Sequence, residues 1–283
     1  GKKVSGYINE ALKLARLNKD SIIGFEADRV PYALAQNWMK ALNCKLKPTH
    51  NLVESLRQYK DEQEIKLIRD ACRKTSKVYN EVMKIIKPGM REIDVAMEID
   101  FRLRKYGAQD NSFQTIVASG PNSAIPHHAT GARKLKAGEP VVMDFGGVFD
   151  GGYCSDITRT IFVPGKKPGT QMKEIYEIVL EANKRARKAL NPEMKVVDYD
   201  RVARDYIESR GYGKYFTHGL GHSLGMEAHD PFDYQNSPLA VGTVITDEPG
   251  IYIEDVGGVR IEDDLVVTAG GAVKLTNAPY WKF

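Results

Sequence analysis

Five residues in the second half of the chain have the types and settings of ligands for divalent cations. They are Asp144, Asp156, His222, Glu248 and Glu262. Four carboxylates and one imidazole make an oxygen-dominated set, which favours hard or borderline ions such as Mn, Co, Fe or Zn. Two such ions about 3.5–4 Å apart would lower the pKa of a shared water. The set therefore predicts hydrolysis without a covalent intermediate.

Asp144 and Asp156 are expected on the two arms of one hairpin. Asp144 lies in the apolar run 140–149, typical of a buried strand, where a lone carboxylate is costly unless it is paired or binds a metal. Asp150-Gly151-Gly152 is a turn signal, so the chain should return through residues 153–162 and bring Asp156 opposite or nearly opposite Asp144. The alternative for Asp156 is an aspartate in a surface turn.

The chain also repeats itself at an offset of 104 residues. Two seven-residue segments match at this offset, 88–94 and 192–198. The same offset brings Asp144 onto Glu248, and an offset of 106 brings Asp156 onto Glu262. This predicts two copies of a unit in which two helices precede a hairpin with two carboxylates. Facing copies would gather four carboxylates in one cleft, where cations are needed to relieve their repulsion. Chance similarity between two helix caps is the alternative.

Local patterns predict the elements that must position these residues. The first fifty-odd residues alternate helix and strand, with elements over 7–17, 21–25, 31–42 and 44–46, and predict a small α/β unit. Two longer helices follow over 61–87 and 91–106, the second ending at Gly107 as a C-cap glycine. We place the domain boundary after residue 52, with domains over 1–52 and 53–283.

The bulk composition is typical of a globular protein. The chain has 283 residues, of which 42% are hydrophobic, and a formal net charge of only +4 with short, broken basic runs. We expect no nucleic-acid partner. No apolar run approaches about 18 residues, and residues 1–6 lack the apolar stretch of a secretory signal, which predicts a cytoplasmic protein without a membrane partner. The three cysteines are expected to be free thiols.

The order of these motifs resembles the pita-bread metallopeptidases, the family of methionine aminopeptidase, prolidase and aminopeptidase P. The resemblance covers roughly residues 52–279 and rests on VVMDFG, SDITRT, HGLGH, EPGIY and RIE, which contain the five ligands. It implies an α+β pita-bread fold with an internal pseudo-two-fold repeat, preceded by a truncated small α/β unit. It further implies manganese or cobalt as the two metals and a homodimer. The family usually separates its two aspartates by eleven residues; here the separation is twelve, and we expect a bulge at Gly151-Gly152.

The resemblance also gives roles to three histidines outside the metal ligands. His127 would face the leaving side of the scissile bond, and His218 would bind substrate. His229 would stabilise the oxyanion or position the carbonyl. Each could instead be a structural histidine in a polar network. The neighbouring His128 matches no family role, and Ser223 and Asp230 replace a common glycine and a common glutamate.

Glu248 and Arg260 complete the expected catalytic set. A carboxylate beside the attacking water can take its proton and pass it to the leaving amine, so Glu248 is our general base. Arg260 lies two residues before Glu262 and should share its face of a strand, where it could hold substrate or carboxylate groups.

Arg-x-Glu together with His-x-x-x-His favours the prolidases and aminopeptidases P within this family. The expected function is hydrolysis of the Xaa-Pro bond at the amino terminus of dipeptides or short peptides. A methionine aminopeptidase or general metalloaminopeptidase is the nearer alternative. A non-enzymatic pita-bread binding module is the other, and the complete ligand set argues against it. The resemblance implies a longer amino-terminal domain of which residues 1–52 would be the remainder, and this leaves the choice between dipeptides and longer peptides open.

Overall fold

The computed structural model describes residues 4–42 and 44–283. Residues 1–3, which belong to the opening segment expected to lack a secretory signal, and Asn43 lie outside the described residues. The chain forms two compact units, residues 1–56 and 57–283. The boundary expected after residue 52 falls at the start of α3 (Leu52–Arg57). Each unit is described by itself.

The first unit alternates helix and strand, as the sequence predicts. Its elements before α3 are α1 (Val4–Leu14), β1 (Ile22–Glu26), α2 (Tyr32–Ala41) and β2 (Lys45–Thr49). The two strands pair in parallel, from Ile22 against Lys45 to Glu26 against Thr49. Alternate side chains of β1 are half-buried, which is the period of two expected for a strand with one covered face.

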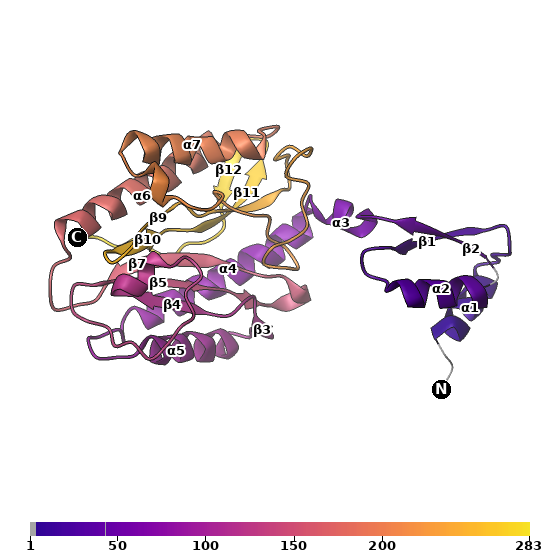
Figure 1. Cartoon of the computed structure of the whole chain (residues 1–283), viewed down its shortest axis with the longest axis horizontal. Helices are drawn as coiled ribbons and strands as arrows, with labels where there is room; N and C mark the ends of the chain where they lie inside the picture. Colours follow the sequence, from indigo (N-terminus) through magenta and orange to yellow (C-terminus); the bar gives the residue numbers. More distant parts are fainter. Residues whose placement is uncertain (1–3, 43) are drawn as a thin grey trace. The chain divides into compact units, whose positions relative to one another are not determined.

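The second unit contains two layers of helices with the strands between them (Figure 1). Its α-helices are α4 (Glu62–Val82), α5 (Glu92–Lys105), α6 (Thr170–Ala189) and α7 (Val196–Ser209). Its short 3₁₀ turns are η1 (Gly120–Ala124), η2 (Asp150–Gly152) and η3 (Gly213–Tyr215). One apolar core lies under α4 and α5, and another lies under α6 and α7.

The strands of this unit are mostly short and antiparallel. In the first half they are β3 (Asp110–Asn111), β4 (Ile116–Ser119), β5 (Pro140–Phe145), β6 (Gly147–Val148) and β7 (Ile157–Phe162). In the second half they are β8 (Val244–Asp247), β9 (Gly250–Ile253), β10 (Gly257–Arg260), β11 (Asp263–Thr268) and β12 (Gly271–Lys274). The central ladders run in the orders β4-β5-β7 and β12-β11-β8.

Helix α4 begins where the sequence predicts and ends five residues early. Asp61 caps it by accepting from the backbone N–H of Glu64, whose side chain accepts from the N–H of Asp61 in return. After Val82 the chain tightens, because the N–H of Ile85 bonds to the carbonyl of Val82 three residues back. The predicted end at Lys87 is therefore wrong by about one turn.

The internal repeat is visible in the arrangement of the elements. Each half has two packed helices followed by an antiparallel pair, β5 with β7 and β8 with β11. Gly107 and Gly211 follow the second helix of each half with φ of 91° and 84°, the left-handed conformation of a helix C-terminus. The second hairpin is not simple, because β9 and β10 form a further hairpin between β8 and β11.

The two halves join along β7. The N–H of Glu262 donates to the carbonyl of Thr158 at 3.0 Å. Two residues further along β7, the hydroxyl of Thr160 donates to the carbonyl of Arg260 at 2.8 Å and accepts from the N–H of Arg260 at 3.0 Å. These bonds bring the carboxylates of the two halves to one junction.

The hairpin of Asp144 keeps one register through its whole length. Asp144 pairs with Thr158, and an isolated bridge between Val148 and Cys154 continues the same register. The expected bulge is therefore wrong. The extra residue is accommodated in the turn Asp150–Gly152, whose two glycines have φ of 72° and 79°. Asp156 lies two residues before Thr158, the partner of Asp144, on the side of the turn, which makes the two aspartates nearly opposite.

Two whole-chain features accompany this fold. The three cysteines are free, as expected. None of the helices in residues 4–42 and 44–283 combines the length and apolar character that a bilayer-spanning helix requires.

A buried ion pair anchors the C-terminal segment to β7. Arg159 is fully buried and donates to Asp263 at 2.7 Å and to the carbonyl of Ala278 at 2.9 Å. The ring of Tyr280 lies 4.8 Å from its guanidinium carbon, and the Tyr280 hydroxyl donates to Asp263 at 2.6 Å. The pair is thus linked to the tail by several short contacts.

We expect Arg159→Met to lower the free energy of unfolding by about 3–5 kcal/mol, because it leaves the buried carboxylate of Asp263 without its main partner. Urea unfolding at pH 7 measures this. The same substitution at Arg73, in an exposed pair with Asp70, should cost less than about 1 kcal/mol. Equal losses in the two variants would contradict the structural role of Arg159.

Candidate active site

All nine residues singled out from the sequence line one cavity of about 480 Å³ between the two halves of the second unit. They are Asp144, Asp156, His222, Glu248, Glu262, His127, His218, His229 and Arg260. The remaining wall includes the apolar side chains of Phe113, Ile116, Pro126 and Ala129. The cavity lining therefore combines charged and apolar side chains.

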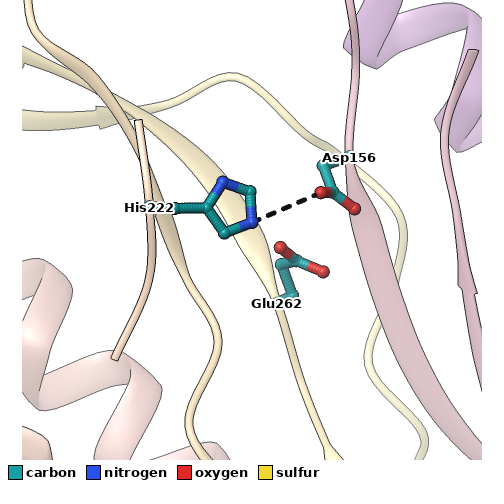
Figure 2. A group of neighbouring side chains, drawn as sticks. All are labelled: Asp156, His222 and Glu262. Atoms are coloured by element: carbon teal, nitrogen blue, oxygen red, sulfur yellow. Dashed lines mark ion pairs between the residues drawn. The ribbon is translucent and has the colours of Figure 1, made fainter. Parts of the chain in front are cut away.

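Three of these residues form a group that could bind a metal ion. Asp156, His222 and Glu262 each offer a ligand atom, and these atoms lie within 4.8 Å of one another. Figure 2 shows the side chains converging, with the Nε2 of His222 3.7 Å from an oxygen of Asp156. They come from three separate segments: the residue before β7, the loop after η3, and the link between β10 and β11.

The other two proposed ligands lie beside this group. Glu248 follows β8 and has an oxygen 3.4 Å from the Nε2 of His222. Asp144, on β5, has one oxygen 2.5 Å from Arg260. The second oxygens of Asp144 and Asp156 are buried and have no hydrogen-bond partner among the described residues. Buried, unpartnered carboxylate oxygens beside a neutral imidazole suit a divalent cation.

The electrostatics of the carboxylates point the same way. Burial, followed by the charges of neighbouring carboxylates, raises the pKa of Asp156 and of Glu262 well above the usual range. Burial also raises the pKa of Glu248 to about 8, with Asp144 adding to the effect and Arg260 opposing it. Like charges this close favour protonation or a cation between them.

His222 is set up to offer a lone pair from Nε2. Burial lowers its pKa to about 4, and the nearby His229 contributes, so the ring is neutral at pH 7. Its Nδ1 lies 3.3 Å from the carbonyl of Ser223 and can donate to it only when it carries the proton. This contact assigns the tautomer and leaves Nε2 free for a metal.

A chain of hydrogen bonds runs from His218 to Asp144. The Nε2 of His218 and a guanidinium N–H of Arg260 both lie 2.8 Å from the hydroxyl of Tyr252. Arginine can only donate, so Tyr252 accepts from Arg260. The Nδ1 of His218 lies 2.8 Å from the carbonyl of Gly219 and must carry the ring proton to donate to it, so the Nε2 of the neutral ring accepts from Tyr252. Arg260 also donates to Thr158 at 3.0 Å. Most of the guanidinium N–H donors of Arg260 are therefore bonded within the protein.

The remaining histidines have distinct settings. The ring of His229 stacks on that of His222, with centroids 3.8 Å apart and planes 15° apart. Burial lowers the pKa of His229. His127 is exposed at the cavity wall. His128, which matches no family role, lies 3.0 Å from the buried carboxylate of Glu92.

Sequence reasoning missed two residues of this region. Tyr252 stood in the EPGIY motif without a role, and only the folded chain brings it to His218. Asp264 is fully buried and accepts from the N–H of Asp156 and from the thiol of Cys72, both at 3.1 Å. Its spacing of two from Glu262 on β11 was the signal that could have found it, since i and i+2 share a face.

Comparisons with known proteins agree with this geometry. Residues 66–269 match the metallopeptidase family M24, and residues 4–59 match the Creatinase/Prolidase N-terminal domain. A Xaa-Pro dipeptidase of Pyrococcus furiosus is 40% identical over 264 residues, covering 92% of this chain and 75% of the relative.

Solved structures give the same result. A Xaa-Pro dipeptidase from Bacillus anthracis superposes with a TM-score of 0.92 at 38% identity, over 99% of this chain and 78% of its own. An X-Pro aminopeptidase from Thermotoga maritima also gives 0.92, at 34% identity, over 99% and 79%. The predicted pita-bread fold is confirmed by these matches.

We expect Asp156→Asn and Glu262→Gln to lose bound metal, because each removes a charged ligand and leaves the neighbouring carboxylates without a shared cation. Elemental analysis of dialysed protein measures this. Asp150→Asn is the matched control, since Asp150 is an exposed acid in the adjacent turn. Metal contents equal to that of the unmodified protein in the first two variants would refute the ligand assignment.

Metal-free protein should lose stability as the pH rises from 6.5 to 8. The pKa of Glu248 is raised from 4.5 to about 8, so the folded protein keeps a proton that the unfolded chain releases. The lowered pKa values of His218 and His222, about 4 against 6.5, have the opposite effect, which is largest below pH 6.5 and fades as the pH rises toward 8. The expected slope is about −1.4 kcal/mol per pH unit for each proton that the folded state retains and the unfolded state releases.

Urea unfolding in EDTA at several pH values measures this slope. Glu248→Gln should make it shallower, and saturating Mn²⁺ should abolish it because the cation replaces the proton. Stability that rises between pH 6.5 and 8 without metal would contradict the role of the buried carboxylates.

Proposed function

This chain belongs to metallopeptidase family M24, and on that premise we propose that it hydrolyses the Xaa-Pro bond at the amino terminus of dipeptides or short peptides. The carrying observation is that one cavity is lined both by a carboxylate-rich group that can bind metal and by apolar side chains. The relatives named above, which are Xaa-Pro dipeptidases and an X-Pro aminopeptidase, support the proline specificity.

We infer two divalent ions, manganese or cobalt, with Zn or Fe as alternatives. Asp156, His222 and Glu262 would hold one ion, and Asp144 and Glu248 would extend the set to the second. When bound, such ions polarise the scissile carbonyl and lower the pKa of a water, so that it can attack the carbonyl as hydroxide. Arg260 offsets part of the negative charge of Asp144 and fixes its orientation through a 2.5 Å contact.

The substrate's proline explains the need for an apolar side to the cavity. A Xaa-Pro bond is a tertiary amide with no N–H to recognise, so the ring must be accommodated by shape and apolar contact. Phe113, Ile116 and Pro126 offer such a surface in the lining of the same cavity, and Ile116 pairs with Asp144 across β4 and β5. His127, which directly follows Pro126 in the lining, would face the leaving proline.

Proton handling falls to neutral histidines and to Glu248. Burial lowers the pKa of His218 to about 4, so at pH 7 its ring is neutral, and its contacts with Gly219 and Tyr252 fix its orientation at the cavity where substrate would bind. His229, stacked on His222, would donate to the developing oxyanion. Glu248 would take a proton from the attacking water and return it to the departing prolyl nitrogen, which must be protonated to leave.

The remaining expectations are part of this proposal. We infer a homodimer that acts in the cytoplasm on small peptides, without a nucleic-acid or membrane partner. The interspersed surface charges, with a net of only +4, support the absence of a nucleic-acid partner.

The test is a substrate panel with Mn²⁺- or Co²⁺-loaded protein. We expect hydrolysis of Ala-Pro or Ala-Pro-Ala, and negligible cleavage of Ala-Ala, of acetylated Ala-Pro and of Met-Ala-Ser. Ninhydrin or chromatographic detection of free proline and alanine measures the rates. Comparable rates on Ala-Ala and Ala-Pro would refute the proline specificity, and preference for Met-Ala-Ser would favour a methionine aminopeptidase. No turnover on any peptide would favour a binding module.

A further inference from the structure

The segment from His222 to Asp230 closes on itself behind the stacked histidines. The N–H of Asp230 donates to the carbonyl of Ser223 at 2.9 Å. Ser223 directly follows His222, and Asp230 directly follows His229. This hydrogen bond therefore links the two residues next to the stacked rings, whose centroids are 3.8 Å apart.

A buried lysine contacts both ends of this closed segment. The Nζ of Lys60 lies 2.9 Å from an oxygen of Asp230 and 3.4 Å from the hydroxyl of Ser223. The side chains of Lys60 and Asp230 are only 2% and 1% exposed. Lys60 is itself held in place, because its backbone N–H donates to the carbonyl of Gly242 at 2.8 Å.

The carboxylate of Asp230 also fits closely against the backbone of the segment. A Cβ built at Gly225 would lie 2.5 Å from an oxygen of Asp230, so glycine is needed there for the segment to wrap around the carboxylate. Arg57 approaches the other oxygen to 2.5 Å. Aspartate, shorter than the glutamate common at this position in the family, is the residue around which these contacts are built.

Net stability is a poor explanation for this ion pair. Desolvating two charges costs about as much as their attraction returns, so a buried pair is often no more stabilising than apolar side chains of the same volume. What the pair does provide is a defined geometry, because its partners must remain within hydrogen-bond distance. Here the geometry that the pair defines is that of the segment carrying His222 and His229.

We propose that Lys60 and Asp230 are positioning residues that hold His229 in its stack on His222 and so aim it into the cavity. Neither residue lines the cavity, so both would act through the histidines. The expected effect on kcat rests on the function proposed above, whereas the expected effect on the stacking of the two rings does not.

The kinetic test is Lys60→Met, which keeps the chain length and removes the charge. Misplacing a catalytic group by about 1 Å can cost 10²-fold, so we expect kcat for Ala-Pro to fall by about 10²-fold. Metal content should be unchanged because all five proposed ligands remain. Glu227→Gln is the matched control: Glu227 contacts Arg57 from the same segment, but its side chain is 51% exposed, and kcat should stay at the level of the unmodified protein.

A second variant covers the case in which Lys60→Met fails to fold because a buried charge is left without its lysine. Lys60→Met combined with Asp230→Asn leaves no unpaired charge. We expect it to fold and still to show the reduced kcat. A folded, metal-loaded protein with unchanged kcat, in either variant, overturns the proposal.

The geometric test does not need turnover. In Zn²⁺-loaded protein with ¹³C-labelled histidine, the stacked rings should shift each other's Hε1 resonances upfield, and His229→Ala identifies the His222 signal. Lys60→Met should remove most of this mutual shift, and Glu227→Gln should leave it. An unchanged shift in the folded lysine variants overturns the proposal even if the substrate panel has already refuted the Xaa-Pro specificity.

Discussion

Several carboxylates buried around one point are the constraint on which the second unit depends. Asp144, Asp156, Glu248 and Glu262 come from four places in the chain, and Asp264 lies directly behind them. Burial and mutual repulsion raise the pKa of most of these groups. Such a cluster is stable only with protons or cations among the acids. The repulsion between the carboxylates therefore destabilises the metal-free folded state and, for the same reason, favours the binding of metal.

The two faces of strand β7 contact different charged groups. Thr158 points toward two of the cavity residues, because it donates to Glu262 and accepts from Arg260. Arg159, the next residue, points the opposite way and pairs with Asp263. Because successive side chains of a strand alternate in direction, one short strand can support the cavity with one residue and anchor the C-terminal segment with the next.

The loops that carry the cavity histidines are held by buried charges of their own. In the first half, the carboxylate of Glu92 accepts from Ser119, Asn122 and His128, which belong to the segment that presents His127. Asp230, which directly follows His229, pairs with Lys60 from the segment just before α4. Loops fixed by several polar contacts are suited to hold catalytic groups within the narrow tolerance that chemistry requires.

The sequence by itself determined the helix and strand alternation, the repeat and the nine cavity residues, because these depend on periodicity, spacing and motifs within short segments. It misplaced the end of α4, did not predict the extra β9–β10 hairpin, and expected a bulge at Gly151-Gly152, where the structure has a regular turn. The sequence also assigned no role to Tyr252 or Asp264. Asp264 acquires its role by contact with Asp156, 108 residues away. Such contacts are decided only when the two halves pack, since no local pattern records which distant group a side chain will meet.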